Sequence, residues 1–234
     1  MTVTLEQRHL RSQDLISQET LNQYGVTILG VGAIGSQLAE QLVKMGVNRL
    51  TLMDFDAVTP VNLGSQGFCE GDVGFAKVSV VADRLKAIDS NVSVVAEPVR
   101  WDPSVPLPSG PVFLLVDSIE VRKAFFNHVF TTEHCRHPVM LDGRMTAEGM
   151  QLCCIDRKQV AHRKAYRETL FPASEAFREG CTAKATIYCA SIAAGLICLL
   201  YKQWIMRTEH GYYHWRAKLN LRAFDLFDAE IVLL

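Results

Sequence analysis

Short β-branched runs alternate along the chain with longer segments in which apolar side chains recur at helical spacing. Residues 26–30 form the first such run, and the apolar side chains that follow fit a helix up to Met45. The same alternation recurs with a strand at residues 49–54 and a helix at residues 73–88. Strands that alternate with helices are typical of a parallel sheet with helical connections. The pattern therefore predicts an α/β fold with helices on both faces of a mostly parallel sheet.

The remaining apolar runs predict the rest of this sheet and its helices. Further strands are expected at residues 92–96, 112–116, 138–142 and 150–155, and further helices at residues 121–130 and 183–204. Residues 5–24 are expected to form a helical arm, the charged residues 156–182 a crossover segment, and residues 218–234 C-terminal edge strands. The 234 residues fit one domain, residues 1–234, because domains mostly hold about 100 to 200 residues.

Composition and charge narrow the class of protein. A hydrophobic share of 49% lets the chain bury a full core, which excludes disorder. The net charge of -1 argues against a nucleic-acid partner. The N-terminus lacks the basic and apolar stretches of a signal peptide, and the seven cysteines show no Cys-x-x-Cys spacing. Both features favour a cytoplasmic protein with free thiols.

One long uncharged segment, residues 185–201, raises the question of a membrane span. It falls short of the roughly 20 strongly apolar residues that a span needs. It also contains Tyr188, Ser191 and Gly195, which weaken its apolar character. We therefore expect a buried helix here and no membrane association.

A glycine-rich turn joins the first predicted strand to the first predicted helix. Gly30, Gly32 and Gly35 follow the pattern Gly-x-Gly-x-x-Gly, which lets backbone amides approach a phosphate at a helix N-terminus. Asp54 ends the next strand, nineteen residues after Gly35, where a carboxylate can accept hydrogen bonds from a ribose. The fold is therefore expected to be Rossmann-like and to bind a nucleotide, and both NAD and ATP offer that ribose.

The segment after Asp54 favours a triphosphate over a nicotinamide cofactor. Asn62 and Gln66 offer amide donors and Lys77 offers a cation, which together suit several phosphate oxygens. Asp117 follows an apolar run and suits Mg²⁺, which prefers hard oxygen ligands. Each residue also has a structural interpretation. Asn62 suits a turn, Lys77 a solvated helix surface, and Asp117 the cap of the next helix.

Taken together, these motifs resemble the ThiF/MoeB/HesA family of adenylating proteins, which are similar to ubiquitin-activating enzymes. The resemblance runs from about residue 8 to about residue 203. Its pieces are Arg8-His-Leu-Arg11, the glycine turn, Asp54-x-Asp56-x-Val58 with Asn62-Leu63 and Gln66, Gly74-x-x-Lys77, and Val116-Asp117 with Arg122. Five motifs in one order make the resemblance specific.

The resemblance implies an ATP- and Mg²⁺-dependent adenylyltransferase that works as a homodimer. Its substrate would be the C-terminal glycine carboxylate of a small ubiquitin-like or sulfur-carrier protein, and pyrophosphate would be released. The residues implied to bind ATP are Gly30, Gly32, Gly35, Asp54, Asp56, Asn62, Gln66 and Lys77. Asp117 would bind magnesium, and Arg11 would reach the partner subunit's site to help Lys77 neutralise the leaving pyrophosphate.

The sequence also departs from the family pattern. The family usually has an arginine where this chain has Ser65, so one phosphate-facing cation is missing. The zinc-binding Cys-x-x-Cys pairs of many members are absent as well, and no zinc is expected. Cys153 and Cys154 are adjacent in a strand, so they face opposite ways and cannot share a metal. The change at Ser65 leaves a non-catalytic nucleotide- or carrier-binding scaffold as an alternative.

Two residues are candidates for the acceptor side of the reaction. Cys181 precedes the long helix, whose N-terminus would lower its thiol pKa, and it matches the family's acyl-accepting cysteine. A buried structural thiol is the alternative. Arg144 resembles a residue close to the adenylate and the acceptor tail, and an ion pair with Asp142 is its alternative. The acceptor stays open: a small molecule, a peptide or a tRNA is also compatible with this fold, and a nicotinamide oxidoreductase is the last alternative.

Overall fold

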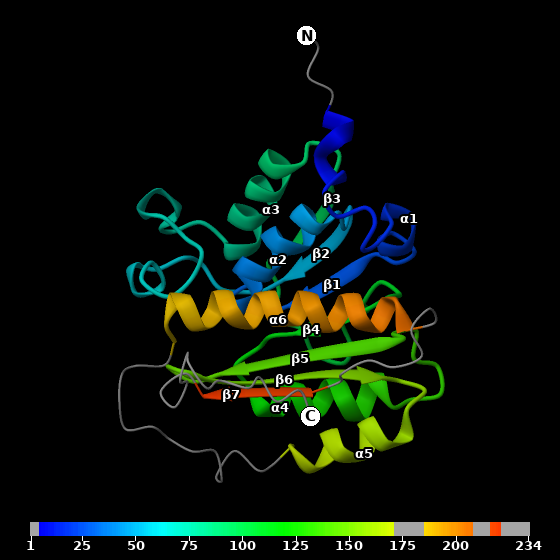
Figure 1. Cartoon of the computed structure of the whole chain (residues 1–234). Coiled ribbons are helices and arrows are strands. Elements are labelled where there is room, and N and C mark those ends of the chain that lie inside the picture. The colour runs from blue at the N-terminus through cyan, green and yellow to red at the C-terminus, as the bar shows by residue number, and fades with distance from the viewer. Residues whose placement is uncertain (1–4, 171–184, 208–215, 221–234) are drawn as a thin grey trace.

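A seven-stranded sheet runs through the computed structural model, which describes residues 5–170, 185–207 and 216–220 (Figure 1). The strands are β1 (Val26–Leu29), β2 (Arg49–Met53), β3 (Ser93–Glu97), β4 (Val112–Leu114), β5 (Val139–Met145), β6 (Gly149–Asp156) and β7 (Arg216–Asn220). Their order is β3-β2-β1-β4-β5-β6-β7. The first five strands are parallel to their neighbours, whereas β6 and β7 pair antiparallel. The predicted mostly parallel α/β fold is confirmed.

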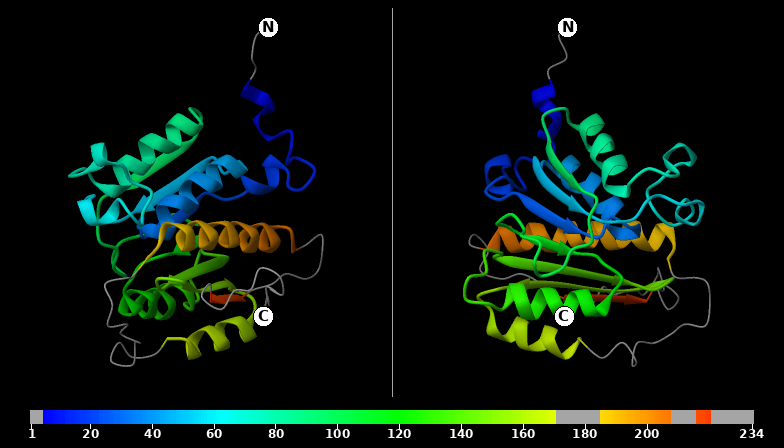
Figure 2. Two further views of the ribbon diagram at one scale, coloured as in Figure 1. Left: turned by 60° about the vertical axis from the view of Figure 1, so that its left-hand side comes forward. Right: turned by 180° about the vertical axis from the view of Figure 1, so that it is seen from behind.

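Helices cover both faces of this sheet, as expected (Figure 2). The longer helices are α2 (Ala33–Met45), α3 (Lys77–Ile88), α4 (Ile119–Phe125), α5 (Val160–Glu168) and α6 (Ile187–Ile205). The short ones are η1 (Leu5–His9), α1 (Gln18–Leu21), η2 (Pro60–Asn62), η3 (Glu70–Asp72) and the π-helical turn η4 (Phe126–Phe130). Residues of α2, α3 and α6 share one buried cluster, and residues of α4 and α5 share the other.

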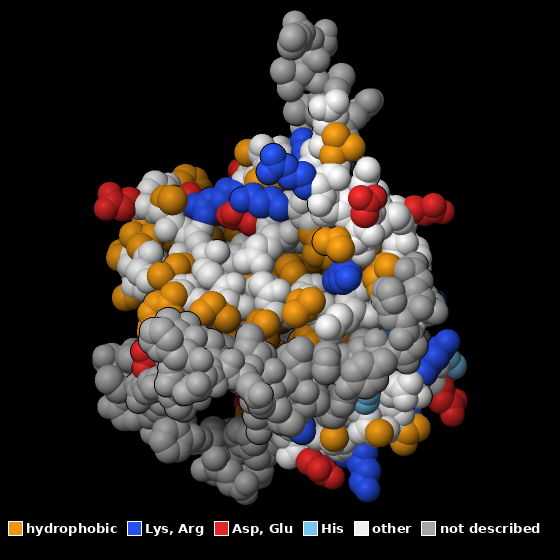
Figure 3. Space-filling view, viewed as in Figure 1, with side chains coloured by type: hydrophobic (Ala, Val, Ile, Leu, Met, Phe, Trp, Pro, Cys, Tyr) orange, Lys and Arg blue, Asp and Glu red, His pale blue; other side chains and the backbone are white. Residues whose placement is uncertain are grey.

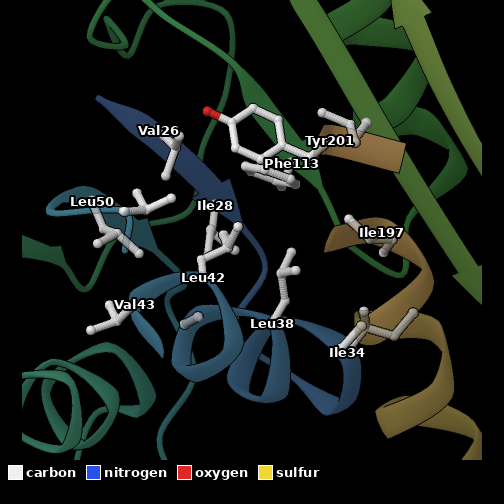
Figure 4. Close-up of a cluster of buried hydrophobic side chains, with 14 of the residues drawn as sticks. Val26, Ile28, Ile34, Leu38, Leu42, Val43, Leu50, Phe113, Ile197 and Tyr201 are labelled. Carbon is white, nitrogen blue, oxygen red and sulfur yellow. The ribbon is translucent and has the colours of Figure 1, made fainter. Parts of the chain in front are cut away.

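Successive strand residues enter these two clusters alternately, because side chains alternate across a strand. Ile28 and Phe113 pack towards α2 and α6 (Figure 4), whereas Leu29 lies in the cluster that contains α4. Cys154 and Cys153 are divided between the clusters in the same way, which confirms that they face opposite ways. Each fully buried large apolar side chain contributes about 1.5–3 kcal/mol to stability.

The helix that was predicted over residues 73–88 begins later, at Lys77. Gly74 has a φ of +92°, which is incompatible with a right-handed helix, and its N–H donates to the Val58 carbonyl over 2.9 Å. The chain therefore makes a turn before α3 starts. This late start places Lys77 at the first helical position, and the consequence for the site is described below.

The predicted crossover at residues 156–182 contains structure that the sequence did not suggest. Part of it is helix α5, and Tyr166 in that helix is fully buried. The Tyr166 ring lies 5.1 Å from the ring of Phe126, measured between centroids. Tyr166 is therefore a core residue, so the prediction of a charged crossover rather than core at residues 156–182 is wrong for this part of α5. Residues 171–182 lie outside the described part of the chain.

Other element boundaries differ by a few residues. The helix predicted at residues 121–130 begins at Ile119 and changes to a π-helical turn after Phe125. The long helix predicted from residue 183 is described from Ile187, and β7 covers Arg216–Asn220. The remaining residues of the predicted C-terminal strands, 221–234, lie outside the described residues.

By length and composition, α6 could cross a membrane, and it is the one such helix in the described chain. One of its faces packs against α2 and the sheet through buried residues such as Ala194, Ile197 and Trp204. Its other face exposes Ile187, Tyr188, Ile192 and Leu199, and Figure 3 shows hydrophobic side chains along this helix. The prediction of a buried helix therefore holds for one face.

Candidate nucleotide-binding site

The turn between β1 and α2 has a backbone that excludes side chains at two positions. Gly30 has a φ of +93°, and a Cβ there would lie 2.6 Å from the Leu115 carbonyl oxygen. A Cβ at Gly35 would lie 2.0 Å from the Gly30 carbonyl oxygen. The turn thus packs closely against the end of β4 and against the first turn of α2. This explains the first and third glycines of the motif.

The amino end of α2 is open to an anion. Gly32 caps the helix, no side chain within the described residues caps it, and its first turn holds no acidic residue. The first N–H groups of a helix lack intrahelical partners and carry partial positive charge. A phosphate group bound there would accept hydrogen bonds from these N–H groups.

Asp54 connects this turn to the end of β2. Its Oδ2 accepts a hydrogen bond from the Val31 N–H over 2.7 Å, and its Oδ1 accepts one from the Asp56 N–H over 2.9 Å. Burial raises the pKa of the Asp54 carboxyl above its ordinary value, although both N–H groups oppose that rise. Each carboxylate oxygen has a second lone pair. Asp54 is therefore fixed beside the glycine turn with acceptor capacity left for a ribose hydroxyl.

Lys77 is a buried cation at the start of α3. Its side chain is 6% exposed, and its Nζ lies 2.9 Å from Oδ2 of Asp56, whose side chain is 48% exposed. Its charge also contributes to lowering the pKa of the Asp54 carboxyl, against the larger effect of burial. The alternative of a solvated surface lysine is thus wrong. Asp56 holds the ammonium in place, a role that the sequence did not reveal.

Asn62 shapes the loop that follows β2. Its Oδ1 accepts hydrogen bonds from the N–H of Thr59 over 2.9 Å and from the Thr59 hydroxyl over 3.0 Å. The interpretation of Asn62 as a turn former is therefore correct. Its Nδ2 group has no hydrogen bond within the described part of the chain and retains its capacity to donate.

Gln66 approaches the amino end of α2. A Cβ placed on Gly32 would lie 3.9 Å from Gln66 Oε1, and this buried oxygen has no hydrogen-bond partner among the described residues. A buried polar atom without a partner is costly, so a ligand is expected to satisfy it. Rotation of the Gln66 side-chain amide by 180° exchanges the positions of Oε1 and Nε2. The Nε2 group could then donate a hydrogen bond to a phosphate oxygen.

Ser36 holds the Gln66 loop in position, and the sequence did not identify it. Its Oγ accepts a hydrogen bond from the Gly67 N–H over 3.0 Å and donates to the Gly32 carbonyl over 2.7 Å. Ser36 and Gly67 are 31 positions apart in the chain, so no local sequence motif predicts this contact.

Asp117 lies beyond the carboxyl end of β4, next to the glycine turn. The Leu115 N–H donates to the Leu29 carbonyl over 2.7 Å, which brings the two chain segments together. The cap of α4 is Ser118, whose Oγ accepts from the Val121 N–H over 3.2 Å. Asp117 is exposed and has no hydrogen bond or ion pair among the described residues. The cap interpretation is wrong, and the carboxylate is available to a metal ion.

Arg144 belongs to a buried ionic network centred on Asp142. Its Nε donates to Asp142 Oδ2 over 2.7 Å, and its Nη1 donates to the Thr169 carbonyl over 2.9 Å. Arg122 pairs with the same carboxylate, and burial lowers the pKa of Arg122 to about 10. The hydroxyl of Tyr166 completes the network over 3.0 Å. The ion-pair alternative for Arg144 is therefore present, and its contact with the acceptor tail stays a prediction.

Arg11 lies away from the Lys77 end of α3. Arg8 forms an ion pair with Asp89, which ends α3, so the N-terminal arm lies beside that end of the helix (Figure 1). A helix of 12 residues is about 18 Å long. Arg11 is exposed and has no ion pair in the described chain. The structure does not bring it together with the other candidate residues of the same subunit.

Two further expectations concern cysteines and metals. Cys181 lies outside the described residues, so its position relative to the site is not defined. Groups of three or more side chains that could hold a metal ion are not found within residues 5–170, 185–207 and 216–220. A magnesium ion at Asp117 would accordingly take most of its ligands from phosphates and water.

The open helix end, the fixed Asp54 carboxylate and the buried ammonium are features of a nucleotide-binding protein with a Rossmann-like fold. The particular family follows from comparison with known sequences. The ThiF family model matches residues 6–230, and the chain belongs to that family.

Curated relatives include two kinds of activating enzyme. The chain is 34% identical over 94 residues to the molybdopterin-synthase adenylyltransferase of Salmonella typhimurium, an alignment that covers 40% of this chain and 38% of that protein. It is 33% identical over 76 residues to ubiquitin-like modifier-activating enzyme 5 of Oryza sativa, which covers 32% of this chain and 18% of the relative. The matches thus span well under half of these relatives.

The fold is also similar to that of a solved structure. E. coli MccB in complex with AMPCPP and MccA superposes with a TM-score of 0.69 at 18% identity, covering 96% of this chain and 71% of MccB. At this identity the similarity establishes the fold alone.

Proposed function

We propose that this protein uses ATP to adenylate a carboxylate and releases pyrophosphate. The observation that carries the proposal is the buried Lys77 ammonium beside the open amino end of α2. A triphosphate bears more negative charge than the pyrophosphate of a nicotinamide cofactor, so a buried cation here favours a triphosphate. The names of the relatives, an adenylyltransferase and a ubiquitin-like modifier-activating enzyme, support this choice.

In the proposed reaction, a carboxylate oxygen of the acceptor attacks the α-phosphorus of ATP. The bond between the α-phosphorus and its bridging oxygen breaks, and pyrophosphate leaves with the electron pair. The protein mainly positions the reactants and neutralises the developing charge. The N–H groups of α2 and the side chains of Gln66 and Lys77 would bind phosphate oxygens, and Asp54 would accept from the ribose.

Magnesium fits this site through Asp117. The carboxylate is exposed and unpaired among the described residues, and it lies beside the turn that would carry the phosphates. When bound, Mg²⁺ would neutralise charge on the leaving pyrophosphate.

The acceptor proposed for this reaction is the C-terminal glycine of a small ubiquitin-like or sulfur-carrier protein. The names of two relatives support this acceptor. One relative is named as an adenylyltransferase of molybdopterin synthase and the other as an activating enzyme of a ubiquitin-like modifier. We further propose that the protein acts as a homodimer in which Arg11 of the partner subunit enters the site. The distance along α3 between the N-terminal arm and Lys77 supports this arrangement.

Calorimetric titration with ATP and Mg²⁺ tests the nucleotide part of the proposal without any acceptor. Hydrogen bonds to charged groups contribute about 1.5–3 kcal/mol, so Lys77→Ala should weaken ATP binding by about ten- to a hundredfold. Lys86→Ala removes an exposed lysine from the same helix and should leave binding unchanged. NAD should give no heat. NAD binding, or equal ATP binding by both variants, would contradict the assignment.

Exchange of labelled pyrophosphate into ATP tests the chemical step. It should require a carrier protein that ends in glycine and should disappear in Asp117→Asn. The second candidate function, a non-catalytic scaffold, is favoured by Ser65 at the position of the family arginine. Tight ATP binding without exchange, across a panel of carriers and peptides, would support the scaffold.

Transfer of the acyl group to Cys181 is a separate step of the proposal. A Cys181→Ser variant should still form the adenylate but should yield an ester that thiols do not cleave. Carrier transfer at the normal rate in this variant would remove Cys181 from the mechanism.

A further inference from the structure

A cavity whose lining includes several charged side chains lies at the end of the strands opposite the glycine turn. It has a volume of about 220 Å³. It is lined by Tyr24, which precedes β1, and by residues 135–138, which precede β5. Asp156 at the end of β6, residues 157–158 after it and Arg207 after α6 complete the lining. Val139 pairs with Asp156 across the antiparallel strands, so these segments meet at the amino ends of the parallel strands. Asp54 and Asp117 follow the carboxyl ends, and the cavity is thus separate from the nucleotide site.

Positive charge dominates the lining of this cavity. Three of the cationic side chains that line it have no acidic partner within the described residues: Arg136, Arg157 and Lys158. Arg157 donates through Nη2 to two neutral carbonyls, those of Thr132 over 2.9 Å and Glu133 over 3.0 Å. These bonds fix its guanidinium without neutralising it.

The acidic residue of the cavity does not offset this charge. Asp156 is buried, and its Oδ1 accepts from the Lys158 N–H over 2.7 Å. Its Oδ2 accepts from Trp204 Nε1 over 2.9 Å and lies 3.2 Å from Arg207 Nε. The carboxylate is thus hydrogen-bonded on both oxygens and balanced by Arg207. Among the residues that the structure describes, three positive charges therefore remain in excess.

Rigid neutral groups complete the cavity wall. His137 is buried, and its Nδ1 lies 3.0 Å from the Gly110 carbonyl, which requires Nδ1 to carry the proton and donate. This bond joins the segments that precede β4 and β5. The cationic side chains therefore project from a fixed frame.

We propose that this cavity binds a phosphate group, either as free phosphate or as the phosphate of a nucleotide, at a site distinct from the ATP site. A doubly charged tetrahedral anion fits three excess cations better than a single carboxylate does. Arginine also presents paired N–H donors that match phosphate oxygens. The Arg157 guanidinium is held for this role by its carbonyl contacts, and Arg136 and Lys158 are exposed at the cavity mouth.

Amide ¹H–¹⁵N spectra of the full chain, titrated with inorganic phosphate at low salt, test the proposal. The amides of His137 and Lys158 report on the cavity, and those of Gly30 and Gly32 report separately on the nucleotide site. Phosphate should shift the cavity amides saturably, and added sodium chloride should weaken the effect. Absence of a saturable shift at the cavity amides would overturn the proposal, whatever happens at the glycines.

The matched variants remove two charges each. Arg136→Ala with Lys158→Ala should weaken phosphate binding at the cavity roughly tenfold. Lys44→Ala with Lys86→Ala removes two exposed lysines from α2 and α3 and should not change it. Equal binding by both double variants would also overturn the proposal. Arg136→Gln with Lys158→Gln, which retains polar side chains, repeats the test if the alanine variant fails to fold.

Adenosine monophosphate distinguishes the two sources of the phosphate. Binding at the cavity amides that is clearly tighter than that of inorganic phosphate assigns the cavity to a nucleotide, and equal binding assigns it to free phosphate. Either result supports the site. Because these readouts lie at the cavity, they do not depend on whether the proposed adenylation is correct.

Discussion

Gly35 is a residue whose absent side chain determines the local structure. A Cβ there would lie 2.0 Å from the Gly30 carbonyl oxygen, and that oxygen belongs to backbone that cannot move aside freely. Gly64 is different, since a Cβ at that position has nothing within 4 Å in the described structure. The two glycines lie near the same site and differ in what a methyl group would contact.

We expect Gly35→Ala to lower the free energy of unfolding by about 3 kcal/mol, because overpacking forces the backbone to shift. For a chain of this size the loss corresponds to a fall in Tm of roughly 10 °C. Thermal unfolding followed by circular dichroism measures it. Gly64→Ala is the control and should melt at the wild-type temperature. A Gly35→Ala protein as stable as the control would show that the turn adapts.

Lys77 and Asp56 show what the sequence predicted about single residues and what it did not. The glycine turn, Asp54 and Lys77 could be predicted because local motifs carry them. The pairing of Lys77 with Asp56 could not, since it depends on where α3 begins. Gly74 delays that start, and without its positive φ the ammonium would lie elsewhere on the helix surface.

At the scale of elements, α5 is the main part of the fold that the sequence concealed. Many of its residues are charged or polar, and the helix buries one large side chain, Tyr166. A pattern of apolar positions has little to detect in such a helix. The strands and α2 were predictable because each buries several side chains at regular spacing. The ion pair of Arg144 with Asp142 was an alternative that the sequence offered, whereas the contacts of Asp142 with Arg122 and Tyr166 were not predicted, since they join separate elements.

Tyr166→Phe should therefore destabilise the protein. The change removes a buried hydrogen bond to Asp142 Oδ2 and is expected to cost about 1–2 kcal/mol. Tyr188→Phe removes a hydroxyl that bonds to Glu148 over 2.8 Å at an exposed position, and it should leave the stability unchanged. Urea unfolding of both variants gives the comparison. Equal midpoints would mean that the Tyr166 hydroxyl contributes nothing to the network.

At the scale of the whole molecule, the position of the N-terminal arm relative to α3 bears on the proposed homodimer. The arm lies beside Asp89 at one end of α3, whereas Lys77 begins the other end. In the proposed homodimer, Arg11 of one subunit would therefore enter the nucleotide site of the other subunit and not its own. Such an arrangement has a specific consequence for mixtures of inactive variants.

Arg11→Ala and Lys77→Ala proteins should each lack pyrophosphate exchange. After the subunits are mixed equally and allowed to exchange, half of the dimers contain one subunit of each kind. Each mixed dimer has one site with both residues intact, so activity should return to about a quarter of the wild-type value. Two Lys77→Ala preparations mixed in the same way serve as the control. No recovery in the mixed sample would place Arg11 outside the partner's site.

The strand order has a consequence for the protein while it is being synthesised. Thr27 in the interior strand β1 pairs with Val112 in β4, 85 residues later in the chain. At roughly 5–20 residues per second, the ribosome exposes one edge of β1 for several seconds before its partner is made. An unpaired apolar strand edge is a template for association with other chains. The strand order that places β4 beside β1 also brings the glycine turn next to the end of β4. We therefore expect the exposed edge of β1 in the nascent chain to need protection from association until β4 has been synthesised.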